Sequence, residues 1–363
     1  MRAWARTWPR WKRLPVEHYG PSVTAVAAFC LLFVSMTACG SGGSRSPAVS
    51  AVPLVNAKNS LLTPTYDGSG QSVEPDVTVF VSPWHGFKYW MVYSPYPNGN
   101  ERDENPSILA SNDGVNWQVP SGLVNPLALP SANDLYLADA SLFYDPKSDQ
   151  LWVYYIDVFK ASMNMRRLTS PDGVNWRDDG VVFTEPDYDI LSPTVSVLGD
   201  TYYMWTINSG SAGCTTTTGT AVEYRTSLDG IHWSAPQPSD MAQPGYFVWH
   251  INGKWIPSKQ EFWVVAAAFP RGTNCAATVL FFLTSQDGVR WTSYNRIALN
   301  KGTTWDQDEI YRSTLWYDSS TDRLSVWYSA RGGVPPTIPY QAGEWHVGLT
   351  QDDYVEFAAW LRH

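Results

Sequence analysis

The chain has 363 residues, a formal net charge of −9 and 14% aromatic residues. Without residues 1–38, which hold five Lys/Arg and one Glu, it keeps 20 basic and 33 acidic residues, a formal charge of −13. So acidic a surface excludes nucleic acid as an expected partner and favours neutral or weakly charged substrates.

Residues 1–38 have the pattern of an export signal. Basic residues come first, and the apolar stretch Val23–Met36 that follows is too short and too interrupted for a membrane span. Small residues before Cys39 resemble a bacterial lipoprotein signal, which would make Cys39 the lipidated first residue of the mature chain; an ordinary secretory signal is the alternative. Residues 39–65 are predicted to be a flexible tether and 66–363 the folded domain, so we expect an extracytoplasmic protein that is lipid-anchored or secreted.

A motif, Ser-x-Asp-Gly-x-x-Trp, occurs four times along the domain. The copies are Ser111–Trp117, Ser170–Trp176, Ser227–Trp233 and Ser285–Trp291, separated by steps of 59, 57 and 58 residues. Asp-Gly favours a tight turn, because these residues tolerate positive φ, and the Ser can bond a nearby backbone amide. A fixed period of this size indicates a repeated supersecondary unit, so we interpret the motif as structural.

Short apolar runs with strand character fill each period, and no segment shows sustained helical periodicity. The predicted strands are Pro75–Phe80, Lys88–Tyr93, Asn105–Ala110, Asp139–Tyr144, Leu151–Tyr155, Ser192–Val197, Tyr202–Trp205, Tyr246–Ile251, Phe262–Ala266, Tyr311–Tyr317 and Leu324–Tyr328. Five units of about 60 residues, each a four-stranded antiparallel sheet, predict an all-β, five-bladed β-propeller. Regular self-similarity argues against a pair of β-sandwiches, and a β-helix needs shorter repeats.

The topology of such a blade decides which residues share a face. The first strand lines the central channel, and its start lies at the same end as the loop between strands 2 and 3. The repeat turns lie at the opposite end. We therefore expect the functional face to carry Asp76, Asp139, Ser192, His250 and Arg312 from the strand starts.

Two cysteines remain besides Cys30 and Cys39. Cys214 and Cys275 fall in strand 2–3 loops of adjacent blades on the functional face. In an exported domain they predict one disulfide, and metal ligation by two cysteines without a His cluster is a weaker reading.

At this level the chain resembles the five-bladed glycoside hydrolases of the furanosidase type, families 43 and 32, and their uncharacterised relatives, over about residues 70–355. The resemblance depends on the blade pattern and on five local segments. These segments are Glu74–Val77, Tyr89–Asn100, Glu104–Ser107, Trp249–His250 and Tyr311–Thr314.

The resemblance implies carboxylate chemistry at the propeller axis. By position, Asp76 matches the base or nucleophile and Asp139 the carboxylate that orients the sugar; a solvated strand-start carboxylate is the alternative for each. Glu104 is the candidate general acid, with Glu223 and Glu309 as alternatives, although a charge on the outer rim would also explain Glu104. Two carboxylates are the minimum for hydrolysis of a glycosidic bond.

Five further residues are expected to bind substrate. His250 could bond a sugar hydroxyl or the catalytic Asp, or be a satisfied channel histidine. Arg312 could bind a carboxylate, or form a structural ion pair. Trp249, Tyr96 and Tyr311 offer aromatic faces on which a sugar ring can stack.

The function predicted first is therefore hydrolysis of a furanoside-containing or related glycan. A non-catalytic, carbohydrate-binding propeller of the cell envelope is the alternative, and a protein-interaction scaffold is a weaker third. No cofactor and no metal at the site are expected, because no EF-hand-like ligand spacing occurs, although a cation in the central channel is left open. The expected partners are carbohydrate and, through the lipid anchor alone, the membrane; the protein is expected to be a monomer.

Overall fold

The structure is a computed structural model, which describes residues 53–131, 134–159, 162–211, 213–215, 219–332 and 344–362. The predicted signal at residues 1–38, the lipidation site Cys39 and the first part of the tether lie outside the described residues. Among the residues that the structure describes, no helix has the length and apolar character needed to span a bilayer.

Five antiparallel sheets follow one another along the chain. Blade 1 contains β1 (Ser72–Trp84), β2 (Phe87–Pro95) and β3 (Ser107–Ser111); blade 2 contains β4 (Asp134–Asp145), β5 (Gln150–Phe159), β6 (Ser162–Ser170) and β7 (Arg177–Glu185); blade 3 contains β8 (Asp189–Leu198), β9 (Thr201–Gly210), β10 (Ala221–Ser227) and β11 (Gln237–Pro238); blade 4 contains β12 (Tyr246–Ile256), β13 (Glu261–Pro270), β14 (Val279–Ser285) and β15 (Thr292–Ser293); and blade 5 contains β16 (Glu309–Asp318), β17 (Arg323–Gly332) and β18 (Glu344–Asp353).

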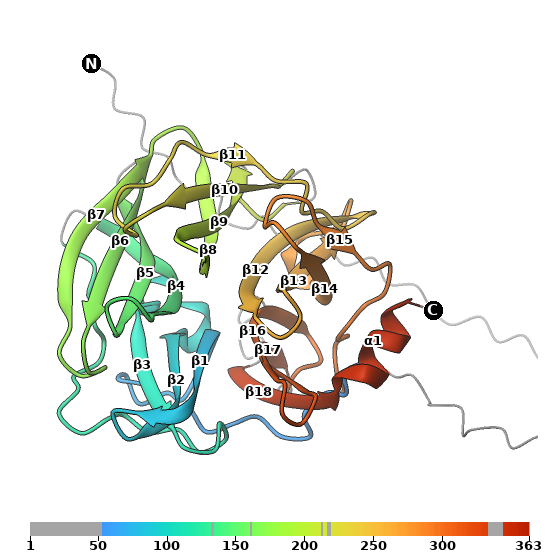
Figure 1. Ribbon diagram of the computed structural model, residues 1–363, viewed down its shortest axis with the longest axis horizontal. Helices are drawn as coiled ribbons and strands as arrows, with labels where there is room; N and C mark the ends of the chain where they lie inside the picture. Colours follow the sequence, from blue (N-terminus) through green and yellow to red (C-terminus); the bar gives the residue numbers. More distant parts are fainter. Residues whose placement is uncertain are drawn as a thin grey trace, which may run out of the picture. The chain divides into compact units, whose positions relative to one another are not determined.

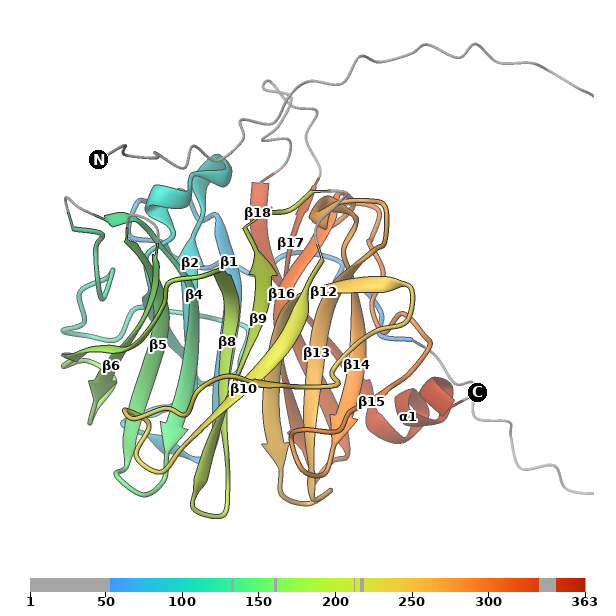
Figure 2. The same cartoon turned by 90° about the horizontal axis from the view of Figure 1, so that it is seen from above.

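The sheets form a ring around a central axis, as Figure 1 shows. The first strands β1, β4, β8, β12 and β16 are innermost, and Figure 2 shows them running side by side along the axis. This confirms the predicted five-bladed β-propeller. Every strand predicted from the sequence lies in or overlaps an observed strand.

Two blades depart from the expected four strands. Among the described residues, blades 1 and 5 have three strands each, and a single bridge between Ala110 and Gln118 takes the fourth position in blade 1. In blade 5 the chain turns into a helix, α1 (Tyr354–Arg362), which the sequence analysis did not predict. Asp353 caps the N-terminus of this helix, because its carboxylate accepts hydrogen bonds from the amides of Val355 and Glu356.

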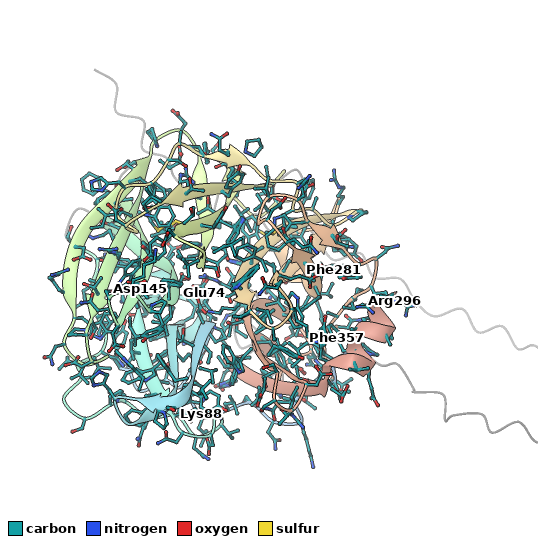
Figure 3. The ribbon with its side chains drawn as sticks, in the orientation of Figure 1. Glu74, Lys88, Asp145, Phe281, Arg296 and Phe357 are labelled. Carbon is teal, nitrogen blue, oxygen red and sulfur yellow. A yellow bond between two sulfur atoms is a disulfide. The ribbon has the colours of Figure 1, made fainter. Side chains whose placement is uncertain are left out.

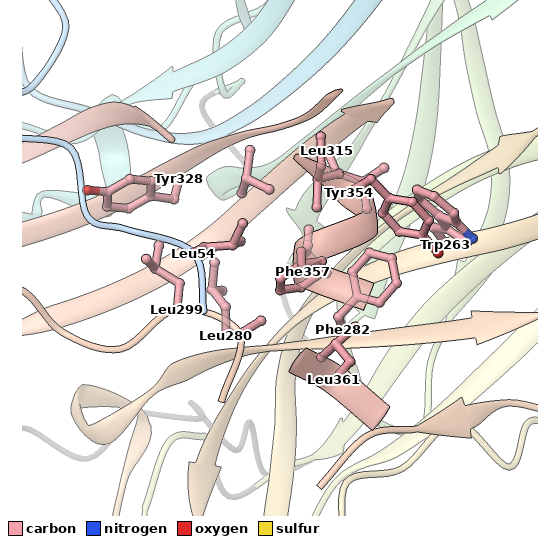
Figure 4. Close-up of a cluster of buried hydrophobic side chains, with 14 of the residues drawn as sticks. Leu54, Trp263, Leu280, Phe282, Leu299, Leu315, Tyr328, Tyr354, Phe357 and Leu361 are labelled. Carbon is pink, nitrogen blue, oxygen red and sulfur yellow. The ribbon is translucent and has the colours of Figure 1, made fainter. Parts of the chain in front are cut away.

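The helix completes the core between blades 4 and 5. Its side chains at helical spacing, Tyr354, Phe357, Ala358 and Leu361, are buried. The ring of Tyr354 stacks on Trp263 with 4.3 Å between centroids. Figure 4 shows this cluster, which also includes Leu54 from the segment predicted to be a tether.

The packed domain therefore begins earlier than residue 66. Leu54 is buried and donates its amide to Ala298, and the amide of Leu61 donates to Val347 on β18. The segment from residue 54 onward is therefore part of the propeller, whereas its polar composition suggested a tether.

The repeat turns have the predicted local chemistry. In the first copy, the Ser111 hydroxyl accepts from the Gly114 amide at 3.0 Å, and Asp113 accepts from the amides of Val115 and Asn116 at 2.8 and 2.7 Å. The other three copies repeat these bonds. The glycines have φ of +70° to +75°, a conformation in which other residues are strained.

Each repeat glycine also contacts an aromatic side chain of the preceding blade. Trp327 and Trp205 donate through their indole N–H groups to the carbonyls of Gly114 and Gly288 at 2.9 and 2.7 Å. A Cβ on Gly173 would lie 2.2 Å from Trp90. The motif therefore joins neighbouring blades at the end of the ring opposite to the strand starts.

The cysteine prediction is confirmed. Cys214, between β9 and β10, and Cys275, at the start of the short helix η3 (Cys275–Ala277), form a disulfide. The bond joins the upper loops of blades 3 and 4.

Candidate functional site

An irregularity at the start of each innermost strand creates the site. The strand pairing is interrupted between Val73 and Asp76, Ala138 and Ser141, Leu191 and Thr194, Val248 and His250, and Ile310 and Ser313. In the first three strands a residue with positive φ occupies the bulge: Glu74 at 58°, Asp139 at 56° and Ser192 at 55°. A bulge redirects a side chain, and a backbone strained in this way marks a functional site.

Three potential metal ligands meet at the axis. Glu74 from β1, Asp139 from β4 and His250 from β12 each offer a donor atom, and these atoms lie within 4.8 Å of one another. Figure 3 shows Glu74 near the centre of the ring. All three residues are at most 2% exposed.

Several polar atoms of this cluster have no hydrogen-bond partner among the residues that the structure describes. They are Glu74 Oε2, Asp139 Oδ1 and both ring nitrogens of His250. The imidazole Nδ1 lies 3.3 Å from Asp139 Oδ1, close enough for an electrostatic contact but without the alignment of a hydrogen bond. Unpartnered buried polar atoms are costly, so their convergence indicates a site built for a ligand.

The charges in the cluster are unequal. Burial raises the pKa of Asp139, but the contact with His250 and the nearby charge of Arg312 outweigh it, so the pKa lies well below its ordinary value. Burial lowers the pKa of His250 despite Asp139, and Arg312 lowers it further. Near neutral pH we therefore take Asp139 as ionised and His250 as neutral, the form of imidazole that binds metals.

Two glutamates hold protons more tightly. Burial first, and then the charges of Asp139 and Glu104, raise the pKa of Glu74 well above its ordinary value. Burial and the charge of Asp139 likewise raise the pKa of Glu104, which is in hydrogen-bonding contact with Glu74. The structure therefore brings Glu104 to the site, where it can hold a proton. The buried cluster thus contains Asp139, which favours its ionised form, beside Glu74 and Glu104, which favour their protonated forms.

Arg312 lies beneath the cluster and is fully buried. Its guanidinium donates to the carbonyls of Ala140 and Pro193 at 3.0 and 2.6 Å, and it lies 3.5 Å from Asp139 Oδ1. Ala140 and Pro193 directly follow the strained residues Asp139 and Ser192. Arg312 thus holds two bulges in place, which favours the structural alternative for this residue over sugar binding.

Asp76 lies apart from these groups. Its carboxylate accepts from Lys254, Ser141 and the amide of Leu142, which occupies both oxygens. The bulge places Glu74 at the position in β1 that corresponds to Asp139 in β4. Glu74, and not Asp76, therefore lies beside Asp139 and His250.

Aromatic side chains form one wall above the cluster. Tyr311 lies 4.2 Å from the His250 ring and 5.2 Å from Trp345, and Tyr96 lies 5.9 Å from Trp345. Trp249 packs edge-on against His250 from the same strand. The predicted aromatic residues are thus beside the site, and Trp345, which the sequence analysis missed, lies among them.

The alternative acids have structural partners. Glu309 pairs with Arg331 at 2.8 Å, and Glu223 accepts from the Tyr188 hydroxyl at 2.7 Å. A surface groove of about 580 Å³, lined by residues such as His85 and Asp172, lies beside the repeat turns at the opposite end.

Glu74 was missed although the sequence contained a signal for it. Glu74-Pro75 and Ser192-Pro193 occupy the same place in their strands, as does Asp139-Ala140. Aligning these dipeptides would have pointed to Glu74, but the bulge that makes them equivalent is visible only in the structure.

The chain is similar in sequence to a deacetylase of blood-group glycans. It is 31% identical over 288 residues, 67% of this chain and 37% of the relative, to the A type blood N-acetyl-alpha-D-galactosamine deacetylase of Flavonifractor plautii. The chain thus spans little more than a third of the length of that curated relative. No protein-family model matches the chain.

Solved structures show the same architecture. An N-acetylgalactosamine deacetylase from F. plautii, in complex with blood group B trisaccharide, superposes with a TM-score of 0.75 at 29% identity, covering 86% of this chain and 98% of that one. A thermostable family-43 glycoside hydrolase gives 0.56 at 10% identity, with coverage of 78% and 91%. An alpha-L-arabinofuranosidase from Lactobacillus brevis gives 0.52 at 13%, with coverage of 77% and 90%. The chain is therefore a five-bladed β-propeller of the glycoside hydrolase-like type.

Proposed function

We propose that this protein is a metal-dependent hydrolase that removes the acetyl group from an N-acetylated sugar in a glycan. The observation that carries the proposal is the buried cluster of Glu74, Asp139 and His250 with its unpartnered donor atoms. The similarity to an N-acetylgalactosamine deacetylase supports the substrate class.

The donor set fits a divalent transition metal. One neutral imidazole and two carboxylates leave positions open for water and substrate, as in catalytic metal sites. The sequence analysis expected no metal at the site, because it found no EF-hand-like ligand spacing. A metal bound here would supply Lewis-acid activation of the acetyl carbonyl and of water.

The other side chains have roles that their positions support. Hydrolysis adds water to the acetyl carbon and breaks the C–N bond, so the departing amine needs a proton. Glu104, whose raised pKa favours its protonated form, can donate its proton to that nitrogen, and the water that is consumed returns a proton to Glu104. Tyr311, Tyr96 and Trp345 offer the sugar an aromatic wall.

Glycoside hydrolysis is the second candidate. The pKa values of Glu74 and Asp139 are shifted in opposite directions, as an acid–base pair requires. The structural neighbours of family 43 have the same fold. Hydrolysis of a furanoside, as predicted from the sequence, is the narrower form of this candidate.

One experiment separates the two candidates. The purified domain is incubated with glycans ending in N-acetylgalactosamine, N-acetylglucosamine or arabinofuranose, with and without EDTA. Acetate and a free amine, lost with EDTA and restored by Mn²⁺, Zn²⁺ or Co²⁺, support deacetylation. Released sugar that is insensitive to EDTA supports the glycosidase, and binding without any product supports the non-catalytic alternative.

The extracytoplasmic location remains a proposal. The disulfide between Cys214 and Cys275 supports it, because such bonds persist in oxidising compartments. Globomycin treatment of producing cells tests the anchor at Cys39: accumulation of a larger precursor is expected, and unchanged processing would contradict it.

A further inference from the structure

We propose that Asp76 is a positioning residue that sets the spacing of the three strands carrying Glu74, Asp139 and His250. The inference rests on the proposed metal site and adds a residue to it. Asp76 touches none of the three ligands in the contacts described above; it acts through the strands that carry them.

The Asp76 carboxylate contacts three other innermost strands. Oδ2 accepts from the Ser141 hydroxyl and the Leu142 amide on β4, each at 2.9 Å. Oδ1 accepts from Lys254 Nζ on β12 at 2.5 Å and from the Thr314 hydroxyl on β16 at 3.4 Å. Asp76 itself lies on β1, so one carboxylate joins four of the five blades.

These contacts follow the candidate ligands closely along the same strands. Asp76 is two residues after Glu74, Ser141 is two after Asp139, and Lys254 is four after His250. The carboxylate therefore joins the same three strands directly after the positions of the ligands.

The surroundings make this connection stiff. Asp76 is 1% exposed, and the side chain of Lys254 is 15% exposed. The Thr314 hydroxyl has a single proton, which it shares between Asp76 and the closer Asn252 Oδ1 at 2.9 Å, and this adds a second tie between β16 and β12. Charge-assisted hydrogen bonds of a buried carboxylate are stronger than neutral ones, so the network resists relative movement of the strands.

The test compares variants that change the charge and the contacts separately. Asp76→Asn keeps the shape but loses the negative charge and one of the two acceptor oxygens. Lys254→Met removes the cation, and the double variant leaves no unpaired buried charge, which restores stability. Lys254→Arg keeps the ion pair and is the rescue variant. Co²⁺ binding is measured by titration, and its visible absorption bands report the ligand geometry.

For the double variant we expect a melting temperature near that of the wild type and shifted Co²⁺ absorption bands. Co²⁺ binding should weaken about tenfold, which is the lower end of the loss typical for residues outside the ligand set. Lys254→Arg should bind as the wild type does. If Asp76→Asn does not fold, the pair Lys254→Met and Lys254→Arg carries the same comparison.

Asp145 supplies a matched control. It is a buried carboxylate on β4 that accepts from the Tyr202 hydroxyl and from Ser148, at the end away from the ligands. Asp145→Asn should lower stability and leave the Co²⁺ spectrum unchanged. If the stable double variant keeps the wild-type Co²⁺ affinity and absorption spectrum, the positioning role of Asp76 is wrong, while the proposed metal site is unaffected. Absence of Glu74-dependent Co²⁺ binding in the wild type would overturn the proposed function, and this inference with it.

Discussion

At the scale of single residues, two carboxylates two positions apart on β1 have opposite surroundings. Asp76 has partners for both oxygens, whereas Glu74 has an unpartnered oxygen beside Asp139 and His250. Position along the strand was predicted from the sequence, but the bulge at Glu74-Pro75 decides which carboxylate faces the site. The same bulge holds Glu74 at a φ of 58°, a strain that the fold maintains.

Glu74→Gln should therefore abolish metal-dependent activity. The amide keeps the shape but binds metal poorly, so we expect a loss larger than the about 10- to 100-fold typical of residues outside the ligand set. Glu356→Gln, an exposed change on α1, is the control. Metal content and acetate release are measured together; a Glu74→Gln variant with full metal content would contradict the ligand role.

The pH dependence of stability follows from the raised pKa of Glu74. In metal-free protein its stabilising effect is present below the ordinary pKa of 4.5 and is lost as pH rises through the raised value. Glu74→Gln lacks this titration. As pH rises from 4.5 to the raised pKa of Glu74, the variant should therefore gain stability relative to the wild type. Urea unfolding in EDTA between pH 4 and 8 measures the difference, and a constant difference would contradict the assignment.

Added metal should reverse the order. The ligands must lose their protons to bind, so metal binding strengthens with pH. Stabilisation of the wild type by Zn²⁺ should therefore grow as pH rises and be absent in Glu74→Gln.

At the scale of elements, the repeat turn joins one blade to the next. Its Ser and Asp side chains fold the turn, and its Gly lets the turn approach an aromatic ring of the preceding blade. Blade 5 has no fifth copy of the motif; there Tyr354 of α1 stacks on Trp263 of blade 4. The sequence signal for α1 was present in the spacing of its apolar residues, but nine residues are too few to separate it from the surrounding strand pattern.

Gly173→Ala should show how closely the blades approach. Both Gly173 and Gly180 have positive φ, but a Cβ on Gly173 would lie 2.2 Å from Trp90, whereas one on Gly180 meets nothing within 4 Å. We expect about 1–3 kcal/mol more destabilisation for Gly173→Ala than for Gly180→Ala, the cost of overpacking. Chemical denaturation measures the free energy of unfolding of both variants. Equal losses would show that Trp90 moves away from the added methyl group without a measurable cost.

At the scale of the whole domain, the ring depends on ties between blades that are distant in sequence. The disulfide joins the upper loops of blades 3 and 4 across 61 residues. The segment that begins at Leu54 joins blades 4 and 5, because it pairs with Ala298 and Val347. Such ties fix the relative positions of the blades whose strands supply the site.

Replacing both cysteines by serine should lower the free energy of unfolding by about 2–4 kcal/mol, since the unfolded chain regains the freedom of a long loop. The melting temperature of the variant and of the wild type with and without reductant checks this. Reductant should have no further effect on the variant. A melting temperature that is the same for the wild type and the variant would mean that the blades hold the loops without the bond.

The sequence by itself determined the propeller, its five units and the cysteine pair, because repeats and alternation are local patterns. It also named Asp139, His250 and Glu104, which the structure brings to one site. Only the tertiary structure decided that Glu74 joins them while Asp76 lies below, bound to Lys254. The physical reason is that one extra residue in a bulge changes which side chain faces the axis, and a site built from three blades exists only when the ring has closed.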